Sequence, residues 1–180
     1  MFKLDIDREL IKKAGYLVET YDFGKRKEAN GNKVQQLVGI IGEQVIRDLF
    51  KAGDINGSNG FDGGYDIKYY DKLIDVKTMS RKSEVKEDFV SNFMELQLSH
   101  SATHFIFNSL NTVKKEITVC GYISKQEFLE KADYYPKGSY RYRTDGTSFQ
   151  TFSGLYEIKN KYLHDVNGWL ELIQKLKYDK

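Results

Sequence analysis

The chain has 180 residues and a formal net charge of +2, with 40% hydrophobic and 30% charged residues. This length suits one domain over residues 1–180 with a proper core, and the composition is typical of a soluble globular protein. The chain contains no run of about 18 apolar residues, which excludes a predicted membrane span, and its N-terminus lacks an apolar signal-peptide core. The single cysteine, Cys120, excludes an intrachain disulfide and a cysteine-rich metal site. We therefore expect a reducing, cytoplasmic setting.

Two helices are predicted in the first fifty residues. The apolar positions over 4–18 indicate a short amphipathic helix, and a polar stretch follows at 24–33. Residues 34–50 predict the clearest helix, because their apolar residues recur at the helical period and form one stripe. A loop with five glycines in twelve residues, 53–64, comes next.

The remaining elements alternate between strands and helices. Strands are predicted over 66–70 and 73–78, with a turn at Asp71 and Lys72, and again over 103–110, 116–123 and 155–159. Ser124 and Glu127 fit a capping box for a helix that ends near residue 132, and 166–176 predicts a closing helix. Residues 80–89 and 135–153 show no clear pattern. This order predicts an α/β fold, a mixed central β-sheet of about five strands flanked by α-helices.

The hairpin over 66–78 separates its side chains into two chemical groups. Directly opposed residues share a face, and so do alternate residues along one strand. With a two-residue turn, Asp66 is predicted to lie opposite Lys77. One face is apolar, with Ile67, Tyr69, Ile74 and Val76, and the other is charged, with Asp66, Lys68, Asp75 and Lys77.

The charged face suits a metal-dependent reaction. Two neighbouring carboxylates repel each other unless a cation neutralises them, and oxygen ligands suit Mg²⁺ or Mn²⁺. A nearby lysine can orient an attacking water or stabilise charge on a phosphate. The alternative is a structural hairpin whose Asp–Lys pairs are solvated, each worth about 0–1 kcal/mol.

Glu43 is the candidate acid on the helix over 34–50. It points away from the main apolar stripe, on a ridge shared with Gly39, Ile46 and Phe50. A carboxylate on a ridge that is otherwise apolar or small favours a role inside the protein, since an unpaired Glu is seldom buried. The alternative is that Glu43 reaches solvent past Arg47.

The order of acidic helix, glycine-rich loop, Asp, hairpin and Asp-Val-Lys resembles the PD-(D/E)XK nuclease superfamily. That family carries an acid on its first core helix, an Asp opening the second strand and (D/E)-X-K in the third strand. The matching positions are Glu43, Asp66 and Asp75-Val76-Lys77, within residues 34–78. Two positions depart from the usual pattern. Tyr65 replaces the Pro of the name, and the third-strand acid is Asp rather than Glu.

The resemblance implies a restriction-endonuclease-like fold, with a core over 34–123 and a C-terminal elaboration over 124–180. It also implies a Mg²⁺-dependent DNA endonuclease in which Mn²⁺ substitutes for Mg²⁺. Asp66, Asp75, Glu43 and the Val76 carbonyl would bind the metal, and Lys77 would position the nucleophile. A possible homodimer would cut both strands of a duplex. An inactive nucleic-acid-binding module, a junction resolvase and an exonuclease remain open, as does RNA as the substrate.

DNA as a partner requires cations around the site. Candidate contacts are Lys68, Lys72, Arg81, Lys82 and Lys86 near the hairpin, the basic run at 25–27, and Arg141 and Arg143 among tyrosines. A solvated surface role is the alternative for each of these groups.

Overall fold

The computed structural model describes residues 1–21, 23, 31–59, 64–143 and 146–170. Three short 3₁₀ turns lie at Gly57–Asn59, Glu95–Gln97 and Asn160–Tyr162, and 166–170 are helical. The main elements, in chain order, are β1 (Phe2–Asp5), α1 (Arg8–Thr20), α2 (Lys33–Phe50), β2 (Ile67–Tyr69), β3 (Lys72–Arg81), β4 (Val90–Met94), β5 (His104–Asn111), β6 (Glu116–Ser124), α3 (Lys125–Lys131), β7 (Asp133–Tyr135), β8 (Tyr140–Tyr142), β9 (Ser148–Gln150) and β10 (Leu155–Lys159).

A mixed five-stranded sheet organises the fold, with strand order β1-β6-β5-β3-β2. Strands β3 and β5 run parallel, and the other neighbouring pairs run antiparallel. A three-stranded sheet, β4-β10-β7, and a two-stranded ribbon, β8-β9, accompany it. The predicted α/β class, with about five strands in a mixed sheet and helices packed against it, is therefore confirmed.

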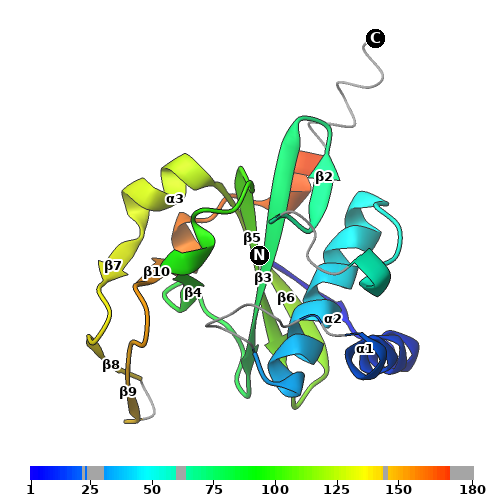
Figure 1. Cartoon of the computed structure of the whole chain (residues 1–180), viewed down its shortest axis with the longest axis horizontal. Helices are drawn as coiled ribbons and strands as arrows, with labels where there is room; N and C mark the ends of the chain where they lie inside the picture. The colour runs from blue at the N-terminus through cyan, green and yellow to red at the C-terminus, as the bar shows by residue number, and fades with distance from the viewer. Residues whose placement is uncertain (22, 24–30, 60–63, 144–145, 171–180) are drawn as a thin grey trace.

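The two faces of the large sheet have different covers. Helices α1 and α2 lie over one face, and β4, β10 and α3 lie toward the other (Figure 1). Ile46 and Phe50 of α2 pack with Ile74 and Val76 of β3 on the first face. On the second face, the core includes Phe93, Phe105, Phe107, Phe128 and Ile158. Alternate residues of β5 thus enter separate cores, with Ile106 on the first face and Phe105 and Phe107 on the second.

The N-terminal prediction was wrong at its first residues. Residues 2–5 form β1, which pairs with β6, and the helix begins later, at Arg8. The Asp7 carboxylate accepts a hydrogen bond of 2.6 Å from the Leu10 amide, which satisfies one of the helix's otherwise unbonded N–H groups. Strand β1 forms one edge of the sheet by pairing with β6. The local pattern of apolar residues contains no signal for this distant pairing.

The predicted hairpin forms, but its register differs by two residues. The turn lies at Tyr70 and Asp71, so Ile67 pairs with Ile74 and Tyr69 with Lys72. Tyr70 adopts a left-handed φ of 53°, which this turn requires. Because a shift of two residues preserves the alternation, both predicted faces survive. The predicted pairing of Asp66 with Lys77 was wrong.

Other predicted boundaries were close, and several strands were missed. Strands β5, β6 and β10 follow their predicted ranges, and Ser124 caps α3 by accepting from the Glu127 amide at 3.2 Å. Strand β3 continues through Arg81 into a segment predicted to be irregular, and β4 and β7–β9 were not predicted. The predicted closing helix begins at residue 166, and its end lies outside the described residues.

Candidate active site

The Asp66 side chain is hydrogen-bonded to Val76, the middle residue of the Asp-Val-Lys segment of β3. Its Oδ2 accepts a hydrogen bond of 2.6 Å from the Val76 amide, and its own amide donates to the Ile74 carbonyl at 2.8 Å. The carboxylate therefore takes the place of a backbone acceptor just before β2 begins. This contact fixes Asp66 beside the strand that carries Asp75 and Lys77.

Asp75 and Lys77 form a shielded ion pair on the opposite face of β3 from Val76. Lys77 Nζ lies 2.7 Å from Asp75 Oδ1, and the two side chains are 18% and 7% exposed. Lys77 Nζ also lies 5.6 Å from the centre of the Phe93 ring. Asp75 Oδ2 is buried and has no hydrogen-bond partner among the described residues. These exposures contradict the alternative of a solvated surface pair.

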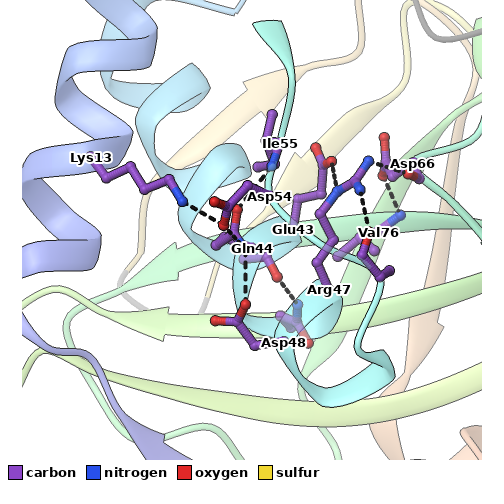
Figure 2. Close-up of polar contacts among 12 residues, drawn as sticks. Lys13, Glu43, Gln44, Arg47, Asp48, Asp54, Ile55, Asp66 and Val76 are labelled. Atoms are coloured by element: carbon purple, nitrogen blue, oxygen red, sulfur yellow. Dashed lines mark hydrogen bonds and ion pairs between the residues drawn. The ribbon is translucent and has the colours of Figure 1, made fainter.

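Glu43 is largely shielded from solvent and forms an ion pair on its own helix. Its Oε1 accepts a 2.7 Å hydrogen bond from Arg47 Nε, one helical turn along α2. Each of the two side chains is 18% exposed. Arg47 Nη2 donates to the Asp66 carbonyl at 2.7 Å and thereby links the Glu43 end of the site to Asp66. Figure 2 shows Arg47 between Glu43 and Asp66.

The chain after α2 is held on the helix by a buried glutamine. Gln44 Oε1 accepts from the Ile55 amide at 3.1 Å, and its Nε2 donates to Asp48 and Asp54 at 2.9 and 3.3 Å (Figure 2). Lys13 of α1 pairs with Asp54 at 2.5 Å. These contacts fix the direction in which the chain leaves α2 toward Asp66.

Helix α2 approaches β3 closely at Gly42. A Cβ atom added to Gly42 would overlap the Thr78 side chain. Asn108 of β5 donates to the Gly42 carbonyl at 3.3 Å, where the β5–β6 register shifts. A residue without a side chain therefore sets the distance between the helix that carries Glu43 and the strand that carries Asp75.

The electrostatics of Asp66 connect all four predicted residues. Burial raises the pKa of Asp66 well above its ordinary value, and the charges of Asp75 and Glu43 raise it further. Lys77 and the Val76 amide act in the opposite direction on this pKa. The three carboxylates therefore lie close enough to repel one another, as expected for groups that a cation would neutralise.

The carboxylates nevertheless do not form a finished metal cage. Among the described residues, no three Asp, Glu, His or Cys side chains are gathered closely enough to hold a metal ion. The physical reason is that Glu43 is turned toward Arg47 and Asp75 toward Lys77. Val76 reaches Asp66 through its amide, so the predicted role of its carbonyl stays a prediction.

The predicted DNA-contacting cations differ in their surroundings. Lys68, Lys82 and Lys86 are exposed, whereas Arg81 donates at 2.6 Å to the Val90 carbonyl and Arg141 pairs with buried Glu157 at 2.6 Å. Arg81 and Arg141 thus have structural partners. The basic run at 25–27 lies outside the described residues.

Sequence reasoning missed the role of Arg47. The i,i+4 spacing of Glu43 and Arg47 on a helix was a signal for an ion pair. The contact of Arg47 with the Asp66 carbonyl had no local signal, because it joins positions nineteen residues apart.

No family model, curated protein or solved structure matches this chain. In the described part of the chain, no helix has the length and apolar character needed to cross a membrane.

Proposed function

We propose that this chain is a Mg²⁺-dependent nuclease of the PD-(D/E)XK type that hydrolyses DNA phosphodiester bonds. The observation that carries the proposal is the bond from the Val76 amide to Asp66, which joins one acid to the strand segment holding the second acid and the lysine. The mixed sheet with α2 against it supports the same reading. The site residues are Glu43, Asp66, Asp75 and Lys77.

The donor chemistry fits a hard divalent cation. Asp75 Oδ2 is a buried acceptor that lacks a hydrogen-bond partner among the described residues. Burial raises the pKa of Asp66, and the charges of Asp75 and Glu43 raise it further. Oxygen ligands of this kind suit Mg²⁺ and Mn²⁺ better than zinc or copper. Asp66 and Asp75 would hold the ion, with Glu43 and the Val76 carbonyl as further ligands.

The bound ion and the surrounding residues would have separate roles in the reaction. A bound Mg²⁺ supplies a Lewis acid that activates water and offsets the negative charge of the phosphate. Lys77, held beside Asp75 and above Phe93, orients the attacking water and donates toward the phosphate oxygens. Gly42 and Gln44 keep α2 and the following chain in position while the substrate binds.

The proposed nuclease would act on DNA as a homodimer in the cytoplasm. A homodimer would place two sites on a duplex and allow both strands to be cut. Cys120 is a buried free thiol, consistent with a reducing cytoplasmic setting. Exposed Lys68, Lys82 and Lys86 are the described cations that we assign to the DNA backbone.

The test is a cleavage assay with purified protein on supercoiled plasmid, linear duplex and a four-way junction. We expect products with Mg²⁺ or Mn²⁺, little turnover with Ca²⁺ and none with EDTA. Nicked or linearised plasmid indicates an endonuclease, shortening of linear duplex alone an exonuclease, and cutting of the junction alone a resolvase.

A matched pair of variants locates the activity. Asp66→Asn should abolish cleavage, whereas Asp71→Asn, which alters an exposed turn carboxylate paired with Lys72, should cut at the wild-type rate. Full activity in EDTA, or wild-type cleavage by Asp66→Asn, would overturn the proposal.

A further inference from the structure

Arg47 joins three separate parts of the candidate site through one guanidinium group. Its Nε donates to Glu43 Oε1 at 2.7 Å, its Nη2 to the Asp66 carbonyl at 2.7 Å, and its Nη1 to the Ala52 carbonyl at 3.4 Å. These acceptors lie on α2, just after α2 and just before β2. A planar group with five N–H donors suits such a junction, and a lysine cannot reproduce it.

The contact to Glu43 differs in kind from the other two. Glu43 offers a full negative charge that a divalent cation would also use, whereas Ala52 and Asp66 offer neutral backbone carbonyls. The Glu43–Arg47 pair is only 18% exposed on each side, so water screens it weakly. A divalent cation that binds the Glu43 carboxylate must therefore displace the guanidinium from it.

We propose that Arg47 is an internal counter-ion that occupies Glu43 in the absence of a divalent cation and competes with that cation for the carboxylate. This inference rests on the proposed function, since the competing ion is the one assigned to the nuclease site. Arg47 is a positioning residue. When Glu43 turns to the ion, the guanidinium stays tethered by Asp66 and Ala52, so α2 and the start of β2 keep their places.

The competition explains why the described carboxylates do not form a finished metal cage. Glu43 is held by Arg47, and Asp75 is held by Lys77 at 2.7 Å. Internal cations limit the repulsion among three nearby acids, which would otherwise destabilise the chain without metal. The cost is a weaker apparent affinity for the ion, because each bound carboxylate must first leave its partner.

The test measures binding of Mg²⁺ or Mn²⁺ alone by titration calorimetry, with no DNA and no cleavage. Arg47→Gln removes the charge and keeps an amide donor, so divalent affinity should rise about tenfold while the metal-free melting temperature falls. Lys68→Gln removes an exposed positive charge from the hairpin that follows Asp66, and should change affinity by less than about twofold.

A double-mutant cycle separates competition from a general effect of charge. In the Glu43→Gln background, the carboxylate for which both cations compete is absent, so adding Arg47→Gln should no longer raise affinity. Arg47→Lys keeps the positive charge but loses the planar set of N–H donors that contacts Glu43, Asp66 and Ala52. It should bind the ion within about threefold of wild type while melting earlier without metal.

The outcomes distinguish this inference from the function on which it rests. A wild-type chain that binds no divalent cation would overturn both. Binding that Glu43→Gln weakens, but that Arg47→Gln leaves unchanged, would overturn the role of Arg47 alone. An equal gain from Arg47→Gln with and without Glu43 would overturn it as well, because the gain would then be purely electrostatic.

Discussion

In the proposed nuclease, the charge of Lys77 would contribute more to the reaction than to the stability of the fold. Its ammonium lies 2.7 Å from Asp75 Oδ1, and both side chains are largely shielded from water. A shielded pair loses hydration on both sides, so its net contribution to the free energy of unfolding is small or unfavourable. A donor near a phosphate, in contrast, gains strength in such surroundings.

Lys77→Ala should therefore lower the cleavage rate about 10²–10⁴-fold while leaving DNA affinity nearly unchanged, because it removes a transition-state contact. The measurement is single-turnover cleavage together with binding in Ca²⁺. The matched control is Lys68→Ala, an exposed lysine on β2, which should weaken DNA binding at most. Cleavage by Lys77→Ala at the wild-type rate would mean that the third-strand assignment is wrong.

His104 gives the fold a dependence on pH that is separate from the site. Its ring stacks against Trp169 with ring centres 5.5 Å apart, and burial lowers its pKa below the ordinary value, with Lys72 adding to the effect. Below an ordinary pKa of about 6.5, the unfolded chain takes up this proton more readily than the folded chain does. The contribution of His104 to stability is complete above that pH and is lost as the pH falls through the folded-state pKa.

His104→Phe should keep the stacking and remove the titration. Between about pH 7.5 and about pH 5.5, its free energy of unfolding should fall less than that of wild type. Urea unfolding followed by the fluorescence of Trp169, the sole tryptophan, measures both proteins. Identical pH dependence in the two proteins would refute the assignment to His104.

At the scale of elements, the contact between α2 and β3 depends on one missing side chain. Gly42 is buried where a Cβ would overlap Thr78, whereas a Cβ on Gly39, on the same helix, would meet nothing within 4 Å. In an open helical position, alanine is more stable than glycine by about 0.5–1 kcal/mol. At Gly42, a methyl group would also push α2 away from β3, and the lost packing would offset the stabilisation that alanine gives the helix.

We therefore expect opposite signs for two matched substitutions. Gly39→Ala should raise the free energy of unfolding by about 0.5–1 kcal/mol, and Gly42→Ala should lower it by about 1–3 kcal/mol. Chemical denaturation of both variants at neutral pH measures these values. Stabilisation by Gly42→Ala equal to that of Gly39→Ala would show that the close approach does not constrain α2.

The hairpin shows which part of the site could be predicted from the sequence. Alternation along β2 and β3 places Ile67 and Ile74 in one core and leaves Asp66, Asp75 and Lys77 on the other side. That grouping depends only on parity and was correct. The register depended on the turn, where packing of Tyr69 edge-on against Phe50, with ring centres 4.7 Å apart, accompanies a left-handed Tyr70.

At the scale of the whole molecule, contacts between distant segments account for what the sequence did not reveal. Strand β1 exists because Phe2 pairs with Val119, and β4 exists because Ser91 pairs with Ile158. Neither partner lies within a window that periodicity can read. The α/β class was predictable because its helices and inner strands carry strong local patterns, including the Asn32 and Ser124 caps.

In the proposed function, the carboxylates around β3 are required for metal-dependent hydrolysis of DNA. The most direct measurement is the cleavage rate of Asp75→Asn at saturating Mg²⁺, compared with wild type on the substrate that wild type cuts best. The substitution keeps the shape of a nearly buried side chain and removes the charge assigned to the ion. We predict a loss of about a hundredfold or more, with a folded protein by circular dichroism. A folded Asp75→Asn protein that cuts within about twofold of the wild-type rate would contradict the claim.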